Sequence, residues 1–246
     1  MLTTALTLAM LANPGAKVQY GPAQPFGGET VRTWVRLDAK NQPEAIGITF
    51  SHKAMQGLPE KKPEIGEGYE TKLTLPAAAK ATPFDHVGVD WNPKGHTPIQ
   101  IYGVPHFDFH FYAVPRSELE KITAQGDDMA RCQTKPAAEY IPEGYIYAPE
   151  SEIPKMGSHW IDVNTPELHG GPFTSTFIYG SYNGKVTFIE PMISRKFMES
   201  KPNFVAAIKQ PKSSPWSGKL VPTEYAVSFD EATKTYTVEL RKFVKA

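Results

Sequence analysis

Proline and glycine occur so often along this chain that long helices have little room to form. The 246 residues include 23 prolines and 19 glycines, which follow no repeating period. Both residues interrupt helices, and both are common in the turns that join short strands. The apolar fraction of 40% and the charged fraction of 21% are ordinary for a globular protein. We therefore predict a mainly β fold, a barrel or sandwich of antiparallel strands, with two or three short helices.

Runs of β-rich residues separated by turn residues predict where the strands lie. Residues 29–50 and residues 223–244 each predict a hairpin, and residues 69–75 alternate between apolar and polar side chains as a strand does. In residues 173–193, two β-rich runs meet at the Asn-Gly pair 183–184, which is the pair best suited to a type I′ turn. These segments are expected to form antiparallel sheets.

Helices are expected in a few short segments. Residues 51–58 predict a helix that ends at Gly57, and residues 117–124 predict another, with a capping box formed by Ser117 and Glu120. Residues 82–103 contain three prolines and three glycines and are too interrupted to form a helix.

Charge and cysteine content exclude several classes of function. The chain has 26 basic and 26 acidic residues, so it lacks the global positive charge typical of proteins that bind nucleic acid or a membrane surface. Cys132 is the only cysteine, which excludes a disulfide framework, a zinc ribbon and an iron–sulfur cluster. Any metal must therefore be held by His, Asp and Glu. The sequence also predicts no stable membrane span.

The first 16 residues resemble part of a secretory signal. They carry no charge, residues 2–12 are largely apolar, and Ala12 and Ala16 offer small residues for cleavage, although the usual basic start is missing. We expect residues 1–16 to be a signal-peptide remnant and residues 17–246 to form a single β-rich domain. The protein would then be secreted or periplasmic; it would be cytoplasmic if residues 1–16 are not a signal.

The segment PHFDFHFY, residues 105–112, carries the most informative pattern in the chain. On a strand, His106, Asp108 and His110 lie on one face and three phenylalanines lie on the other. A solvent-exposed strand without any function could also carry such a polar face. The surrounding aromatic residues instead favour a polar face that is partly enclosed and functional. Residues two apart on a straight strand are separated by about 6.6 Å and residues four apart by about 13 Å. Neighbouring pairs can therefore share an ion, whereas both histidines can do so only if the strand bends or carries a bulge.

Further metal ligands must come from other segments. The strongest candidates are His159, in the segment MGSHW, and Glu190, which ends the strand KVTFIE on the face of Phe188. His86 and His96 form a second tier, because each can equally hydrogen-bond a loop. A site of two or three histidines and a carboxylate suits Zn, Fe, Mn, Ni or Cu.

Four strings of this sequence resemble a known family. TPFDHVGVDWNPKGH, VPHFDFHFY, MGSHW and FTSTFIYGSYNGKVTFIEPM, in this order, are similar to a family of uncharacterised, mostly exported bacterial proteins whose structurally studied member is a sigma-E-regulated protein of a thermophile. The resemblance runs from about Gln19 to the C-terminus and implies export, one conjoined domain and an envelope-stress setting, but no reaction. The positions that mark the family are His86, Asp90, His96, His106, Asp108, His110, His159 and Glu190.

These observations lead to three hypotheses. In the first, an exported protein binds one divalent metal through His106, His110, His159 and Glu190, with Asp108 as a ligand or as a partner of a ligand. An open coordination position would make it a metal-dependent hydrolase or a cupin-like oxygenase, and a closed one a structural or storage site. In the second, the histidine face binds a small polar or lipid-like ligand without metal. In the third, the protein is a homo-oligomeric envelope-stress protein without catalysis.

Overall fold

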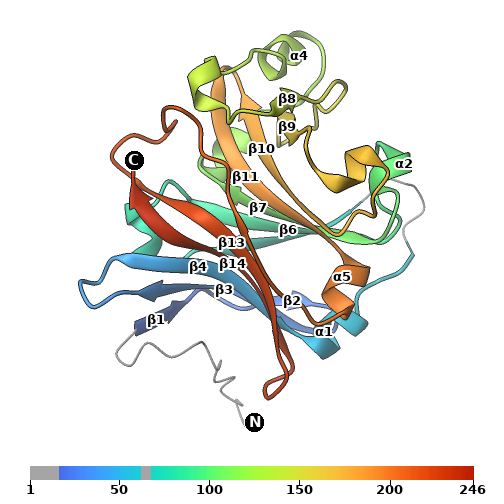
Figure 1. The fold of residues 1–246 in the computed structure, drawn as a ribbon, viewed down its shortest axis with the longest axis vertical. Helices are drawn as coiled ribbons and strands as arrows, with labels where there is room; N and C mark the ends of the chain where they lie inside the picture. Colours follow the sequence, from blue (N-terminus) through green and yellow to red (C-terminus); the bar gives the residue numbers. More distant parts are fainter. Residues whose placement is uncertain (1–16, 62–67) are drawn as a thin grey trace.

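The computed structural model describes residues 17–61 and 68–246, which form two antiparallel sheets packed face to face (Figure 1). The predicted signal-peptide remnant, residues 1–16, lies outside the described residues. Among the described residues neither sheet closes on itself, so the mainly β prediction is confirmed in its sandwich form.

The first sheet contains the two ends of the described chain. Its strand order is β1-β3-β4-β14-β13-β12, and β2 pairs with β3 at one end. The strands are β1 (Lys17–Tyr20), β2 (Gln24–Phe26), β3 (Glu29–Leu37), β4 (Pro43–Ser51), β12 (Asn203–Ala207), β13 (Leu220–Asp230) and β14 (Thr235–Lys245). The β3–β4 and β13–β14 hairpins are the two that the sequence predicts at residues 29–50 and 223–244.

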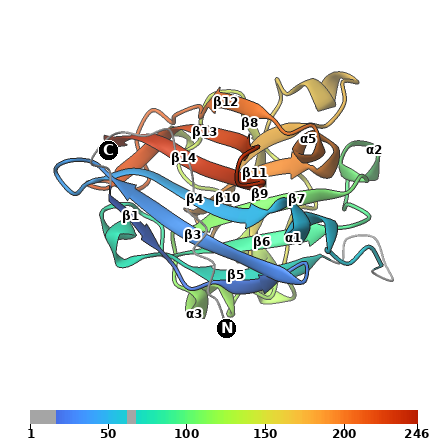
Figure 2. The ribbon, with the colours of Figure 1, turned by 90° about the horizontal axis from the view of Figure 1, so that it is seen from below.

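The second sheet has the order β5-β6-β7-β11-β10-β9-β8. Its strands are β5 (Tyr69–Thr74), β6 (His86–Asn92), β7 (His106–Tyr112), β8 (Tyr145–Tyr147), β9 (Ser158–Asp162), β10 (Ser175–Tyr182) and β11 (Lys185–Ser194). The β10–β11 hairpin turns at Asn183 and Gly184, which both have positive φ as a type I′ turn requires. Figure 2 shows the two sheets as layers, with β3, β4 and β14 in front of β5, β6 and β7.

Five short α-helices connect the strands, and none in the described chain is longer than the six residues of α4. They are α1 (His52–Gln56), α2 (Ile99–Tyr102), α3 (Arg116–Leu119), α4 (Asp127–Cys132) and α5 (Arg195–Glu199), with 3-10 turns at η1 (Ala77–Ala81), η2 (Ala138–Tyr140) and η3 (Pro166–His169). No helix among these described residues has the length and apolar character needed to cross a membrane.

One predicted helix is wrong in its extent and its cap. The helix expected over residues 117–124 is a single turn, α3, that begins after Pro115, and Ser117 lies inside it rather than capping it. The Glu120 carboxylate does not fold back onto the helix. It lies 3.3 Å from Lys72 Nζ and 3.6 Å from Lys155 Nζ, so long-range ion pairs replace the local capping box.

The core lies between the two sheets. Phe107, Phe109 and Phe111 of β7 are fully buried in it, and Phe50 of β4 approaches Phe107 with ring centroids 6.0 Å apart. Burying one such ring stabilises the fold by about 1.5–3 kcal/mol. The alternation of β7 therefore fixes its orientation, because the phenylalanine face must meet the first sheet.

The opposite face of the second sheet is also covered. One small apolar cluster there contains Tyr112, Leu119, Ile122, Ala124, Cys132 and Phe188, and another contains Tyr102, Phe173, Ile178 and Met192. In Figure 1 the segments α4, β8 and β9 lie at the top of the molecule, and β6, β7 and β11 run between them and the first sheet below. The polar residues of β7 are thus enclosed between two apolar clusters.

Candidate metal centre

The outer face of β6, β7 and β11 gathers most of the histidines and buried carboxylates of the described chain. His106, Asp108 and His110 point to this face, and all three are buried. The register places Asp90 of β6 opposite Asp108, and Gly88 opposite His110. Two buried carboxylates on adjacent strands repel each other unless a cation lies nearby.

Three residues from three strands form the first potential metal site. His110 of β7, His159 of β9 and Glu190 of β11 each place one ligand atom within 4.8 Å of the others, and we call them the His110 trio. His110 Nε2 lies 3.4 Å from Glu190 Oε2. The β7–β11 register has no paired residue at Glu190 or at Pro191, so the strand ladder is interrupted beside the trio.

The hydrogen bonds of the two rings decide which nitrogen faces the site. His159 Nδ1 lies 2.8 Å from the carbonyl oxygen of Ser151, an acceptor, so Nδ1 carries the proton. His110 Nδ1 lies 3.0 Å from Asp90 Oδ2, an ion-pair distance, although the contact does not count as a hydrogen bond. In both rings Nδ1 faces an oxygen outside the trio, so Nε2 is the nitrogen that can bind a metal once it is deprotonated. An oxygen partner on the distal nitrogen is typical of histidines that bind metal.

Aromatic packing holds the two rings in place. Tyr112 stacks on His110 at 5.4 Å with an interplanar angle of 9°, and Phe188 meets His110 and His159 edge-on at 5.1 Å and 5.3 Å. Gly180 makes room for Phe188, because a Cβ at residue 180 would lie 1.9 Å from the Phe188 ring. A glycine is therefore needed at this position for the Phe188 contact.

The buried groups perturb each other's protonation. Burial by itself lowers the pKa of His110, but Glu190 and Asp90 outweigh it and raise this pKa to about 9. Burial raises the pKa of Glu190 to about 7 and lowers the pKa of His159 to about 4. Glu190 Oε2 is also buried without a hydrogen-bond partner. Without a metal, a protonated His110 offsets part of the carboxylate charge but leaves Glu190 Oε2 without a hydrogen bond, and a metal that binds here must displace the proton of His110.

A second group lies farther along β7. His96, His106 and Asp108 also place one ligand atom each within 4.8 Å of the others, and we call them the His96 trio. His96 follows β6 in the turn at Gly95, whose φ of +69° and 2.0 Å Cβ approach to the Tyr102 carbonyl both require glycine. Despite burial, His106 and His96 hold the pKa of Asp108 well below its usual range.

The structure divides the residues expected to share one ion. Of the predicted ligands His106, His110, His159 and Glu190, the last three form the His110 trio, whereas His106 belongs with His96 and Asp108. His86 joins neither trio, because its Nδ1 lies 2.9 Å from Asp85 and its ring stacks on Tyr112.

Two residues that contact members of the trios were not identified from sequence patterns alone. Asn92 donates a 2.7 Å hydrogen bond from Nδ2 to Asp108 Oδ2, and Asp90 contacts His110. Both lie on β6 in a segment that looks irregular in the sequence. Asp90 is among the positions that mark the resembling family, which is the one signal that points to it.

A cleft of about 140 Å³ opens beside the His110 trio. Asp90, His86 and Tyr112 form its inner wall, and Lys72 and Arg116 are among the residues at its rim. None of the three trio residues lines it, so a molecule in the cleft reaches Asp90 before it reaches the potential metal position.

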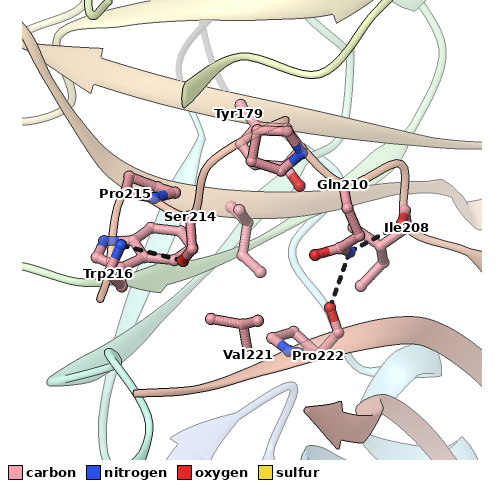
Figure 3. A pocket seen from close by; sticks show the side chains of 10 residues that line it. Tyr179, Ile208, Gln210, Ser214, Pro215, Trp216, Val221 and Pro222 are labelled. Carbon is pink, nitrogen blue, oxygen red and sulfur yellow. Dashed lines mark hydrogen bonds between the residues drawn. The ribbon is translucent and has the colours of Figure 1, made fainter. Parts of the chain in front are cut away.

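Figure 3 shows a second hollow, lined by Tyr179, Gln210, Trp216 and neighbouring residues. Its volume is about 10 Å³, roughly what one water molecule needs. Gln210 Nε2 is already engaged there with the carbonyl oxygens of Ile208 and Pro222, at 2.8 Å and 3.1 Å. This hollow is a packing defect rather than a ligand site.

Comparison with known proteins gives one match. A family model described as TTHB210-like, hypothetical protein TTHB210, matches residues 38–91. The matched segment covers β4, α1, β5 and most of β6, including His86 and Asp90, and ends before both trios. No curated protein and no solved structure matches the chain. The similarity supports the expected family resemblance over these residues and says nothing about export or sigma-E regulation.

Proposed function

We propose that this protein binds a divalent metal ion through His110 Nε2, His159 Nε2 and a carboxylate oxygen of Glu190. The observation that carries the proposal is the convergence of these three atoms within 4.8 Å of one another, from three different strands. The buried, unpartnered Oε2 of Glu190 supports it, because a buried carboxylate oxygen without a donor is costly unless a cation compensates it.

The ligand set limits the choice of metal and of chemistry. Two imidazoles and one carboxylate suit Zn, Fe, Mn, Ni or Cu, and they leave coordination positions for water or substrate. A metal here could lower the pKa of bound water or bind oxygen, as in a metal-dependent hydrolase or a cupin-like oxygenase. Because the cleft reaches Asp90 and not the trio itself, metal binding is the function that the geometry supports best.

Metal analysis of the purified full chain tests the proposal. We expect Glu190→Gln and His159→Gln to lose one zinc equivalent relative to the unsubstituted protein after zinc loading and dialysis. His169→Gln is the matched control, since His169 is a histidine outside both trios whose Nε2 contacts the Val163 carbonyl. Zinc content below about a tenth of an equivalent in the unsubstituted protein, unchanged after loading with Zn, Cu or Fe, would exclude the proposal.

The cleft favours a second candidate, a ligand-binding module that works without metal. Its rim carries Lys72 and Arg116, and its inner wall carries His86 and Tyr112, which suits a small polar molecule. Under this alternative, substitutions in the histidine face weaken ligand binding in chelator-treated protein. Ligand binding that requires added metal would reject it.

We also propose that the protein is exported, on the uncharged and apolar character of residues 1–16 alone. Cell fractionation tests this directly: we expect the protein outside the cytoplasm, with a mature chain that starts near residue 13 or residue 17. A cytoplasmic protein that keeps Met1 would contradict it.

A further inference from the structure

The His96 trio repeats the features of the His110 trio at a separate place on the same face. Its ligand atoms come from two β7 residues, His106 and Asp108, and from His96 in the loop after β6. The proposed metal centre uses none of them, and the argument for the His96 trio does not depend on that centre.

Both histidines turn Nε2 toward Asp108. His106 Nδ1 lies 2.7 Å from the Val104 carbonyl oxygen, and His96 Nδ1 lies 2.8 Å from the Thr97 carbonyl oxygen. Because a carbonyl only accepts, each Nδ1 carries a proton, so Nε2 is the ring atom that either carries a second proton toward Asp108 or, once deprotonated, binds an ion. Either protons or a metal ion must therefore lie between these two nitrogens and the Asp108 carboxylate, since bare lone pairs would repel it.

Distances distinguish a metal ion from a shared proton. Nε2 of His106 lies 3.3 Å from Asp108 Oδ1, and Nε2 of His96 lies 3.4 Å from Asp108 Oδ2. Charge-assisted N–H···O hydrogen bonds are shorter, about 2.7–2.9 Å. By contrast, ligand atoms about 2.1 Å from a tetrahedral zinc ion are separated from each other by about 3.4 Å.

The environment of Asp108 supports the same conclusion. His106 Nε2 and Asp108 Oδ1 are buried and have no hydrogen-bond partner. The other carboxylate oxygen accepts the 2.7 Å hydrogen bond from Asn92, which orients the carboxylate toward the rings. The side chain of His96 is 29% exposed, so an ion can enter from solvent on the loop side.

We propose that His96 Nε2, His106 Nε2 and Asp108 form a second divalent metal site, which makes the outer face of the second sheet a two-ion centre. Asp108 and His110 are two residues apart on β7, a separation of about 6.6 Å between their backbone positions. Two dications this close repel each other, so the two sites are expected to fill in separate steps with unequal affinity.

Zinc stoichiometry tests the second site. Chelator-treated full chain is dialysed against zinc, and bound metal is measured by mass spectrometry. We expect two equivalents in the unsubstituted protein, one in His96→Gln, one in Glu190→Gln and none in the double variant. His96 lies in a partly exposed loop, so His96→Gln should fold, and circular dichroism checks this. His86→Gln is the matched control, because His86 lies on the same face and belongs to neither trio.

The outcomes separate the two proposals. If His96→Gln keeps all of the zinc while Glu190→Gln loses it, the second site is wrong and the first stands. The reverse result overturns the first centre and leaves the second. A single equivalent that both substitutions abolish would show one shared site and would overturn the two-ion centre. Cobalt absorption spectra give an independent readout, since His96→Gln should remove one of two sets of ligand-field bands.

Discussion

At the scale of single residues, the buried charged side chains on the outer face of the second sheet cost folding free energy. Asp90, Asp108 and Glu190 are buried carboxylates on three adjacent strands. The hydrophobic effect cannot explain why these carboxylates are buried, because a buried charge usually destabilises a fold unless it is paired or binds an ion. Each imidazole of the two trios, in turn, has an oxygen beside Nδ1 that leaves Nε2 directed at the site.

Asp90 is predicted to orient His110 rather than to bind the metal itself. We expect Asp90→Asn to weaken zinc binding at the His110 trio by about 10–100-fold, the usual effect of losing the partner of a metal-binding histidine. Competition with a zinc-binding dye measures this change. The unsubstituted contact is the 3.0 Å approach of Asp90 Oδ2 to His110 Nδ1.

The chain supplies a matched control for this substitution. Asp85 likewise pairs with a histidine Nδ1, through a 2.9 Å hydrogen bond to His86, but it does so outside both trios. Asp85→Asn should therefore leave zinc affinity unchanged. Equal losses in the two variants would show that charge in general, rather than the orientation of His110, determines affinity.

At the scale of elements, local patterns were predictable and long-range pairings were not. The two-residue period of β7 correctly separates its polar face from its phenylalanine face, and the Asn-Gly turn correctly places the β10–β11 hairpin. Strand β6 was missed because Gly88 and the flanking prolines hide it, yet its register with β7 brings Asp90 and Asn92 to the site. That register depends on contacts between segments, which no local pattern contains.

The end of β11 shows the same limit. The sequence predicts that the strand ends at Glu190 before Pro191, but β11 continues to Ser194 because Pro191 pairs with Phe177 of β10 and has no partner on β7. Proline is tolerated there because its missing N–H faces the gap in the ladder. The register on either side of the gap places Glu190 opposite His110.

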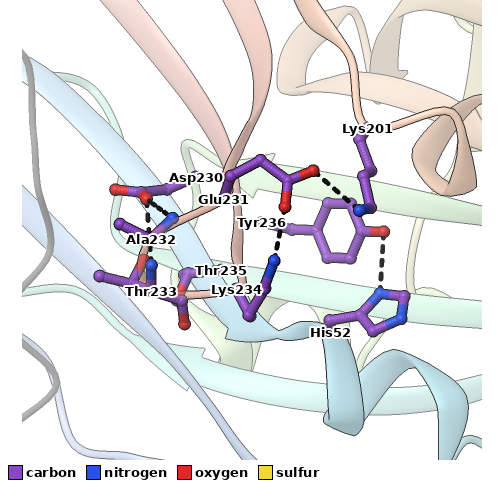
Figure 4. Close-up of polar contacts among 9 residues, drawn as sticks. All are labelled: His52, Lys201, Asp230, Glu231, Ala232, Thr233, Lys234, Thr235 and Tyr236. Atoms are coloured by element: carbon purple, nitrogen blue, oxygen red, sulfur yellow. Dashed lines mark hydrogen bonds and ion pairs between the residues drawn. The ribbon is translucent and has the colours of Figure 1, made fainter.

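The β13–β14 turn offers a prediction on pH dependence (Figure 4). Glu231 lies 2.7 Å from Lys201 Nζ and 2.6 Å from Lys234 Nζ, and these contacts lower its pKa from 4.5 to about 2. A carboxylate with a lowered pKa in the folded state stabilises the protein above pH 4.5, and this contribution is lost as the pH falls toward 2. The pairs are exposed, so the contribution is small.

We therefore expect Glu231→Gln to lower the Tm slightly at pH 7, by no more than about 2 °C, and to change it less at pH 3. Thermal melts at the two pH values measure the difference. Glu143→Gln is the control, since Glu143 is an exposed carboxylate with no ion pair within the described chain. If the Tm difference between Glu231→Gln and the unsubstituted protein grew as the pH fell, the assigned role of Glu231 would be wrong.

At the scale of the whole molecule, the second sheet is buried on both faces, by the first sheet on one side and by loops and short helices on the other. The sequence predicts the fold class, because composition and strand patterns suffice for it. The strand order cannot be read from these patterns, and it is the order β6-β7-β11 that brings ligands from distant segments together. Each trio therefore exists only when the second sheet has assembled.

Metal binding should for this reason stabilise the entire fold and not one loop. An ion that binds only the folded state at 100 times its Kd contributes about 2.7 kcal/mol. For a chain of this size that corresponds to a rise in Tm of about 5–10 °C for one site. Differential scanning fluorimetry with increasing zinc measures the rise, which excess chelator should reverse. Without zinc, the Tm of Glu190→Gln should lie near that of the unsubstituted protein, because the substitution changes the side-chain volume very little. With zinc, the variant should lose the part of the Tm rise that comes from the His110 trio, because it lacks the charge of the ligand. A zinc-dependent rise that is identical in Glu190→Gln and in the double variant with His96→Gln would mean that the ion binds elsewhere, and that the buried carboxylates are neutralised by protons alone.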